Sequence, residues 1–249
     1  IKAKDVFPFI NLQMLIGKHL GLKWIVGKML EKQDSRTVKI YNEIKEIIEH
    51  GDEYFDITAI YKYFPVRRKY GKEKNEFSLE ILSDDLTEVI ETFNFPRQKY
   101  GQYLSLNDYV NPDGIDYVGF FVVTAGEKSR IVSNELKAKG EFYKGHLVNS
   151  IGLELAEATS EYIHQIMRKD VGIIDKELQT EDILKANYQG NRYSFGYPAC
   201  PDLSDQKKLF KLLKPEIYGI KLTDEFMMYP EASVSAIVFS QPFCKYFNM

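Results

Sequence analysis

The segment "NRYSFGYPACPD" (191–202) concentrates residue types that bind small polar ligands. Arg192 carries a planar guanidinium that matches the shape of a carboxylate. Gly196 permits close approach to the backbone, and Tyr197 offers an aromatic face or a hydroxyl. The two prolines of the "PACP" run fix φ and remove two backbone donors, so the remaining N–H and C=O groups point in fixed directions. The segment therefore predicts a site where an arginine holds one end of a ligand and a stiff loop hydrogen-bonds a flat heterocycle at the other.

A structural interpretation fits the same residues. In that interpretation Arg192 pairs with a structural acid, and the prolines only tighten a turn. Cys200 also has two interpretations, because a nucleophilic thiol needs a nearby base. The chain has four histidines and none of them is close to Cys200 in the sequence, so we expect Cys200 to be a small buried side chain.

Two other patterns resemble binding motifs but lack an essential part. "EYIH" (161–164) has the Glu-x-x-His spacing of di-iron bundles, with Glu157 one turn earlier, yet such sites take the motif from two helices and it occurs once here. We therefore expect no metal site and a solvated helix face. "HLGLKWIVGK" (19–28) has neither the G-x-G-x-x-G spacing nor a preceding strand, which argues against dinucleotide binding.

The composition narrows the class of partner. Lys and Arg total 33 against 36 Asp and Glu, and the net charge of −3 gives no field that would draw the chain to nucleic acid or to an anionic membrane. The longest apolar runs, such as "YVGFFVVTA" (117–125), reach about half of the roughly 20 residues that a membrane-spanning helix needs. Two cysteines do not make a disulfide scaffold, so a reducing cytoplasm fits best. We expect no nucleic-acid partner and no membrane.

Amphipathic periodicity predicts the helices that would position these residues. Apolar residues recur at intervals of three and four between Phe9 and His50. The longest pattern covers 152–170, and a shorter helix is predicted over 204–214 with Pro215 as its stop. Opposite the apolar stripe of the long helix lies a polar one made of Glu154, Glu157, Glu161, His164 and Arg168.

A hairpin is predicted in the first half of the chain. The segments 54–64 and 75–82 are rich in aromatic and β-branched residues and flank the charged stretch "RRKYGKEK" (67–74). This pattern predicts two paired strands with a charged tip, and Pro65 and Gly71 mark the places where the hairpin bends.

The order of elements favours an α+β fold. Segment 117–125 predicts a strand buried on both faces, and "SVSAIVFS" (233–240) predicts another. Hairpins imply antiparallel pairing, and the chain lacks the even βαβ rhythm of a doubly wound sheet, so we expect one α+β domain over 1–249. Because Ile1 is followed by no charged-then-apolar leader, we also expect no signal peptide and an origin in a longer chain.

Several separated blocks resemble one known family. "LAEATSEYIHQIMR", "NYQGNRYSFGYPACPD" and "GIKLTDEFMMYPEASVSAIVFSQPFCKYF" closely resemble the C-terminal activation domain of cobalamin-dependent methionine synthases, which binds S-adenosylmethionine. The family's R-x-x-x-G-Y signature appears as Arg192, Gly196 and Tyr197. The resemblance is strong from about residue 100 onward, returns at "KDVFPFI" near the N-terminus, and is weak between about 20 and 100. It implies a single α+β domain with a twisted antiparallel sheet flanked by helices.

The resemblance implies a role for individual residues toward S-adenosylmethionine. Arg192 would hold the ligand's carboxylate, Asp5 its amino group, and Glu157 would add negative field for the sulfonium. Tyr246 would lie beside the ligand, and the loop around Ala199 would line the adenosine side. The full implied set is Asp5, Glu157, Arg192, Gly196, Tyr197, Pro198, Ala199, Cys200 and Tyr246.

One position departs from the family pattern. The family often has a second acid directly before the "NYQG" block, where this chain has Ala186, and Glu181 or Asp182 would be the nearest substitutes. The chain also has no D-x-H-x-x-G motif for cobalamin, no three-cysteine zinc set and no room for a folate barrel, so this piece alone is not expected to make methionine.

The resemblance implies a part in reductive reactivation. The domain would dock on the cobalamin-binding domain and present the methyl group of S-adenosylmethionine. With one electron from a flavodoxin or a similar reductase, inactive cob(II)alamin would become methylcobalamin. The domain would contribute binding and positioning, so we expect no catalytic acid–base residue in it.

Two functions from other classes stay open. One is a stand-alone S-adenosylmethionine-dependent methyltransferase, which would need a glycine loop after a first strand, and the sequence lacks one. The other is a ligand-binding or interaction module that kept the fold and lost methyl transfer, which Ala186 favours.

Overall fold

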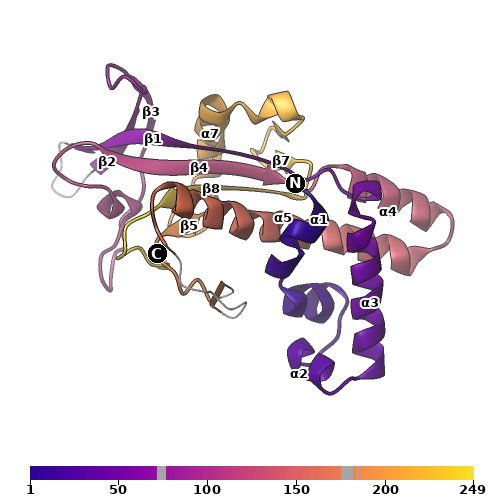
Figure 1. Ribbon diagram of the computed structural model, residues 1–249. Helices are drawn as coiled ribbons and strands as arrows, with labels where there is room; N and C mark the ends of the chain where they lie inside the picture. Colours follow the sequence, from indigo (N-terminus) through magenta and orange to yellow (C-terminus); the bar gives the residue numbers. More distant parts are fainter. Residues whose placement is uncertain (72–76, 175–181, 184) are drawn as a thin grey trace. The chain divides into compact units, whose positions relative to one another are not determined.

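The computed structural model describes residues 1–71, 77–174, 182–183 and 185–249 (Figure 1). These residues form two units. Unit 1 contains Ile1–Ala59, Val123–Tyr162 and Met228–Val234; unit 2 contains Ile60–Val122, Ile163–Met227 and Ser235–Met249. The expectation of a single domain over 1–249 stays a prediction.

The central element of unit 2 is an antiparallel sheet. Among the described residues it has six strands in the order β3-β2-β1-β4-β8-β5, and the pairs β1–β2, β2–β3 and β5–β8 are antiparallel. Helices accompany it, so the predicted α+β class with an antiparallel sheet is confirmed. The strands are β1 (Thr58–Tyr70), β2 (Phe77–Leu82), β3 (Val89–Phe93), β4 (Asp116–Thr124), β5 (Asn191–Tyr193) and β8 (Ser233–Phe239).

Helix α5 (Phe142–Asp170) packs on one face of the sheet with its last turns, which belong to unit 2. Gly119 of β4 faces this helix, and a Cβ built there would stand 2.4 Å from Cε of Met167 and 3.2 Å from Cβ of Val238. Tyr63 of β1 lies on the same side, since its hydroxyl donates to the carbonyl of Met167 at 3.0 Å. A glycine in β4 thus lets α5 lie close to the sheet.

The neighbouring residues of those strands point to the opposite face, as the two-residue period requires. Phe64, Phe93 and Phe120 form a ring cluster there, with centroids 5.3 Å apart for Phe93 and Phe120 and 6.0 Å apart for Phe64 and Phe120. Helix α7 (Gln206–Leu213) lies on the sheet nearby, and Figure 1 shows it above β4 and β8. The Ser235 hydroxyl donates to Oε1 of Gln206 at 2.9 Å and ties β8 to α7.

Unit 2 also holds shorter elements. They are η4 (Leu106–Tyr109), η5 (Leu203–Asp205), η6 (Pro215–Tyr218) and strand β6 (Lys221–Leu222).

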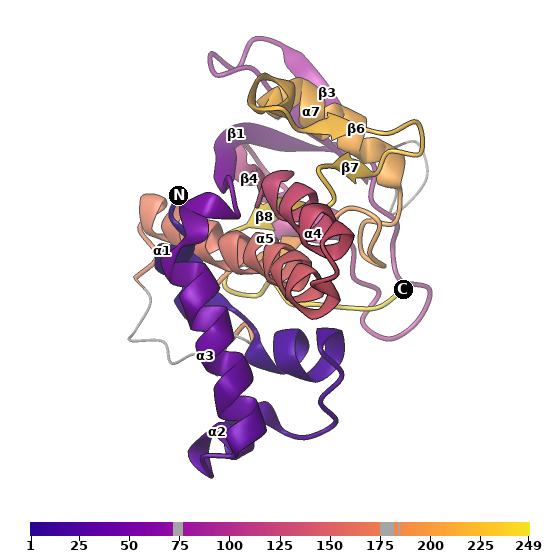
Figure 2. The same ribbon diagram turned by 90° about the vertical axis from the view of Figure 1, so that its right-hand side faces the viewer.

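Unit 1 is mainly helical around its own apolar core. Helix α3 begins after Asp34, whose carboxylate accepts from the backbone N–H of Thr37 at 2.9 Å. It buries Ile40, Ile44 and Ile47 at helical spacing, and Figure 2 shows it running past α1. The elements of unit 1 are α1 (Ala3–Val6), η1 (Phe7–Phe9), η2 (Gln13–His19), α2 (Val26–Glu31), α3 (Ser35–Glu49), η3 (Gly51–Glu53), α4 (Lys128–Ala138), the first part of α5, and strand β7 (Met228–Tyr229).

Most predicted elements are present, with shifted boundaries. The hairpin is confirmed, but β1 extends through Pro65 to Tyr70, so the prediction that residues 67–70 belong to a charged tip was wrong, because they pair with β2. The bend at Pro65 stays a prediction. Residues 72–76 of the predicted tip lie outside the described residues. The long helix starts ten residues earlier than the predicted 152.

The prediction that the polar stripe of α5 faces solvent was wrong for three of its residues. Glu154, His164 and Arg168 are buried, at 6%, 0% and 2% exposure. Glu154 lies 3.0 Å from Nε2 of His19, and His164 and Arg168 lie against the ring of Tyr188. Each buried polar side chain therefore meets another polar or aromatic group, which periodicity alone does not reveal.

The space at Gly119 generates a prediction about stability. Gly119→Ala places a methyl group against Met167, so we expect the free energy of unfolding to fall by about 1 to 3 kcal/mol through overpacking. Urea denaturation measures it. Gly27→Ala is the control, because a Cβ there meets nothing within 4 Å, and its stability should stay equal or rise by up to about 1 kcal/mol. An unchanged stability in Gly119→Ala would contradict close packing of α5 on β4.

Candidate functional site

Arg192 lies on β5, the edge strand of the sheet in unit 2. Its backbone is opposite Val238 of β8, and the hydroxyl of Tyr246 donates to its carbonyl at 2.6 Å. Its half-buried side chain donates from Nη1 to the hydroxyl of Tyr188 at 3.1 Å. Backbone and guanidinium of Arg192 are therefore both held by other parts of unit 2.

The loop after β5 folds back on itself. Gly196 has φ of 89°, which favours glycine, and its N–H donates to the carbonyl of Cys200 at 2.9 Å. The N–H of Cys200 donates to the carbonyl of Tyr197 at 2.9 Å. Tyr197 and Pro198 are exposed, whereas Ala199 is buried. Within the described part of the chain, the backbone N–H and C=O of Ala199 make no hydrogen bond.

Cys200 is a buried side chain in this loop. It is 2% exposed, its thiol donates to the carbonyl of Ser194 at 3.5 Å, and burial raises the pKa of the thiol far above its usual range. A thiol with a raised pKa is a poor nucleophile. These facts favour the interpretation of Cys200 as a small buried residue that shapes the loop.

Tyr246 is positioned by a C-terminal segment that lies against β5. The amide of Asn191 donates to the carbonyl of Cys244 at 2.9 Å. The hydroxyls of Tyr193 and Tyr109 both donate to the carbonyl of Lys245, at 2.9 and 3.0 Å. Because the residues on its N-terminal side are fixed in this way, the ring of Tyr246 stays beside Arg192 although it is 60% exposed.

Asp5 and Glu157 belong to unit 1. Asp5 is an exposed residue of the short helix α1, which the buried side chains of Ala3 and Val6 fix in the core of that unit. Glu157 is an exposed residue of α5 between the buried residues Ala156 and Ala158. The structure thus groups the other predicted residues in unit 2, and the placement of these two acids at the same site stays a prediction.

Three residues around Arg192 were missed by the sequence analysis. Cζ of Arg168 lies 3.9 Å from the centroid of the Tyr188 ring, and the ring of His164 meets the same ring edge-on at 5.3 Å. His164 and Arg168 are four residues apart on α5, so they share one helix face. The four-residue spacing of His164 and Arg168 was the signal that could have identified them as a pair. The sequence analysis instead predicted that this polar stripe faces solvent.

Neither ring nitrogen of His164 has a hydrogen-bond partner among the described residues. Burial, followed by the nearby charges of Arg192 and Arg168, holds the pKa of His164 well below its usual value of about 6.5. His164 is therefore neutral at neutral pH.

Ala186, which stands where the family often has an acid, adopts φ of 52°. Of the two candidate substitutes, Glu181 lies outside the described residues. Asp182 accepts from the side chain of Asn187 at 3.4 Å. A replacement for the missing acid stays unassigned.

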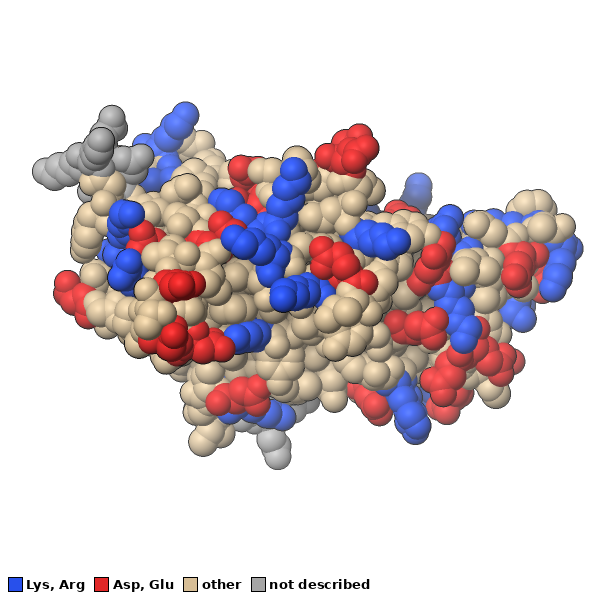
Figure 3. Space-filling model, turned by 90° about the horizontal axis from the view of Figure 1, so that it is seen from above, with Lys and Arg blue, Asp and Glu red and all other residues tan. Residues whose placement is uncertain are grey.

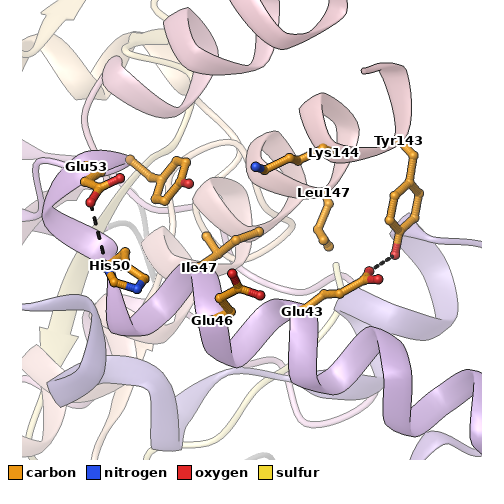
Figure 4. A pocket seen from close by; sticks show the side chains of 9 residues that line it. Glu43, Glu46, Ile47, His50, Glu53, Tyr143, Lys144 and Leu147 are labelled. Atoms are coloured by element: carbon orange, nitrogen blue, oxygen red, sulfur yellow. Dashed lines mark hydrogen bonds and ion pairs between the residues drawn. The ribbon is translucent and has the colours of Figure 1, made fainter. Parts of the chain in front are cut away.

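A separate cavity of about 470 Å³ lies in unit 1 between α3 and the start of α5 (Figure 4). Glu43, Glu46 and Glu53 contribute carboxylates to it, and the hydroxyl of Tyr143 donates to Glu43 at 2.7 Å. None of the predicted ligand-binding residues lines this cavity.

The surface carries both signs of charge. Figure 3 shows basic and acidic side chains interspersed, so neither sign covers that face alone. Both cysteines are free thiols. Over the described ranges, no group of His, Cys, Asp and Glu has the arrangement of a metal site, and no helix combines the length and apolar character needed to cross a bilayer.

Comparisons with known proteins agree with this geometry. Residues 4–249 match the family described as "Vitamin B12 dependent methionine synthase, activation domain". The methionine synthase of Mycobacterium tuberculosis (strain ATCC 25618 / H37Rv) is 33% identical over 206 residues, and that of Mycobacterium leprae (strain TN) is 32% identical over 206. In both cases the match covers 77% of this chain and 17% of the relative. The chain therefore belongs to the activation-domain family of vitamin B12-dependent methionine synthases.

A solved structure supports the same assignment. The crystal structure of the MetH reactivation domain bound to AdoHcy superposes with a TM-score of 0.88 and 26% sequence identity, and the match covers 100% of this chain and 79% of that one. The α+β fold with an antiparallel sheet that the family resemblance implied is thereby confirmed.

The burial of His164 predicts a pH dependence of stability. Because its pKa is lowered in the folded chain, the unfolded chain binds a proton first as pH falls below about 6.5, so acidification favours unfolding. Below that pH we expect the free energy of unfolding of the parent to fall by up to about 1.4 kcal/mol per pH unit more than that of His164→Phe. The variant keeps a ring at this position but has no group that titrates. Urea denaturation between pH 5 and 7.5 measures both slopes. Equal slopes would show that the pKa of His164 is the same in the folded and the unfolded chain.

Proposed function

We propose that the chain binds S-adenosylmethionine in unit 2, with Arg192 on the ligand's carboxylate and the loop around Ala199 on the adenosine side. The observation that carries this proposal is that a positioned guanidinium and a stiff loop occur together, and that the backbone polar groups of Ala199 in this loop have no hydrogen-bond partner among the described residues. A planar carboxylate matches the guanidinium, and a flat heterocycle matches a fixed N–H and C=O pair.

The remaining family residues complete the proposed site. Gly196 is exposed, and it carries no side chain that would separate a ligand from the backbone, whereas a Cβ there would crowd Cδ1 of Leu203 at 3.1 Å. Tyr197, Pro198 and Tyr246 present exposed rings to the ligand, and Cys200 fixes the loop behind them. Asp5 would take the amino group and Glu157 would lie near the sulfonium, since both are acidic and exposed. The family relationship and an AdoHcy-bound solved relative support this arrangement.

The proposed activity is the reductive remethylation of cobalamin held by a separate cobalamin-binding domain. Cobalamin, reduced by one electron from a flavodoxin or a similar reductase, would take the methyl group, while the C–S electron pair stays on sulfur and leaves S-adenosylhomocysteine. The residues of this chain bind the sulfonium compound and orient its methyl group, and no proton transfer is needed. The chain spans 17% of the curated methionine synthases, so methionine formation belongs to the whole protein. Free cysteines fit a cytoplasmic location.

A second candidate function is a ligand-binding module that has lost methyl transfer. Ala186 favours it, because an acid near a sulfonium would contribute to binding and this position has none. A stand-alone methyltransferase has no comparable observation in its favour. Measurements of ligand binding and of methyl transfer distinguish these three candidate functions.

Calorimetric titration of S-adenosylmethionine tests the proposed site. We expect the parent to bind, and Arg192→Ala to lose about 2 kcal/mol or more of binding free energy because the carboxylate loses its charged partner. Arg67→Ala is the control. Arg67 is an arginine of β1 in the same unit that pairs with Glu80 at 2.7 Å, and its loss should leave affinity unchanged.

Two results would contradict this assignment. If the parent does not bind, the "PACP" segment is a scaffold. If both arginine variants bind like the parent, Arg192 has a structural role and does not hold the ligand's carboxylate.

Transfer of the methyl group needs a separate test. The chain is mixed with a cobalamin-binding domain containing cob(II)alamin, S-adenosylmethionine and reduced flavodoxin, and the absorbance of methylcobalamin is followed. We expect the product with the parent and a rate at least tenfold lower with Arg192→Ala at subsaturating ligand, since a loss of 1.4 kcal/mol is tenfold in affinity. Binding without any product would favour the module. Methylation of a small molecule in the absence of cobalamin would favour the methyltransferase.

A further inference from the structure

The side chain of Arg192 is fixed by Tyr188, a residue to which neither the sequence nor the family resemblance gave a role. Nη1 of Arg192 donates to the Tyr188 hydroxyl at 3.1 Å. The two residues are four positions apart and flank the start of β5, so a short stretch of chain joins donor and acceptor. This contact directs one edge of the guanidinium to Tyr188 and limits its rotation.

Tyr188 is in turn fixed by two buried residues of α5. The guanidinium of Arg168 lies over its ring at 3.9 Å from the centroid, well inside the range of a cation–π contact. His164 meets the same ring edge-on, with 5.3 Å between centroids and planes at 78°. Both side chains are at most 2% exposed, so they have little freedom to move. A helix packed on the sheet therefore determines where the Tyr188 hydroxyl stands.

The charge state of these groups favours the same arrangement. His164 is neutral, because burial and the two arginines lower its pKa, so it adds no third positive charge beside Arg192 and Arg168. Tyr188 offers an oxygen lone pair to one arginine and its π-face to the other. One aromatic side chain thus interacts favourably with both cations.

The backbone of Arg192 is restrained as well, by its pairing with Val238 and by the hydroxyl of Tyr246. A long side chain anchored at both ends loses little further freedom when a ligand binds, which is the basis of pre-organisation. Loss of the Tyr188 hydroxyl would remove a contact at the distal end and leave these backbone restraints in place.

We propose that Tyr188 is a positioning residue that holds the guanidinium of Arg192 in place for the ligand's carboxylate, with Arg168 and His164 fixing the tyrosine ring. This inference rests on the proposed binding of S-adenosylmethionine. It assigns Tyr188 no contact with the reacting atoms, since its effect passes through Arg192.

The test compares two ligands that differ only in the carboxylate. S-adenosylmethionine and decarboxylated S-adenosylmethionine are titrated calorimetrically into the parent, Tyr188→Phe and Tyr61→Phe. We expect Tyr188→Phe to weaken S-adenosylmethionine binding about fivefold or more and to leave the decarboxylated ligand within about twofold of the parent. Tyr61 is a matched control, because its hydroxyl also bonds a charged residue in the same unit, Asp170 of α5 at 2.8 Å, and its loss should change neither affinity.

Other outcomes overturn the inference. An equal loss for both ligands in Tyr188→Phe would mean that the hydroxyl supports the site in general and not through the carboxylate. Unchanged affinity for S-adenosylmethionine would mean that Arg192 is held without Tyr188.

A ligand-free measurement separates this inference from the proposed function. NMR of the Arg192 guanidinium in the unliganded chain reports rotation about its terminal bonds, and we expect rotation to become faster in Tyr188→Phe and to stay unchanged in Tyr61→Phe. If the parent fails to bind either ligand, the proposed function fails, and this measurement still decides whether Tyr188 holds Arg192. Unchanged rotation in Tyr188→Phe would overturn the inference in either case.

Discussion

The arrangement of unit 2 depends on the close approach of α5 to the sheet at Gly119. The terminal methyl of Met167 occupies the place where any other residue would have its Cβ, so the helix lies against β4 without an intervening side chain. His164 and Arg168 lie three residues before and one residue after Met167 on the same helix, and both are buried. They contact Tyr188, and Tyr188 contacts Arg192. Contacts thus connect the helix that packs at Gly119 to the arginine at the sheet edge through Tyr188.

An edge strand is a suitable place for that arginine. β5 is three residues long and pairs on one side with β8, so the sheet fixes the direction of the strand while the side chain of Arg192 stays partly accessible. The loop that follows is closed by hydrogen bonds within residues 194–200, and the C-terminal segment lies against the strand through Asn191 and Tyr193. The proposed binding site is built from such restrained parts, so it would need little further ordering when a ligand enters.

The sequence predicted the elements better than the burial of their polar faces. Aromatic and β-branched content located the hairpin, and a nearly continuous apolar run located the strand at 117–125, because a strand buried on both faces needs apolar side chains at successive positions. The same reasoning placed His164 and Arg168 in solvent, because periodicity records which residues are apolar and does not record that Tyr188 would cover two polar ones. For the site, the arginine and loop were identified from residue types. Tyr188 lies in the block "NYQGNRYSFGYPACPD", but the sequence analysis assigned it no role, because the side chains that pack on its ring belong to a helix about twenty residues earlier in the chain.

The titratable groups around Arg192 are suited to binding rather than to proton transfer. Burial raises the pKa of the Cys200 thiol and lowers that of His164, so at neutral pH one is protonated, the other is neutral, and neither exchanges a proton readily. General acid–base catalysis needs a group whose pKa lies near the working pH. A sulfonium methyl donor needs no such group, because the positive charge on sulfur already makes it a leaving group. In the proposed site the positioned arginine would fix the donor's carboxylate and the stiff loop would fix its adenine ring, so binding and orientation are what unit 2 would contribute.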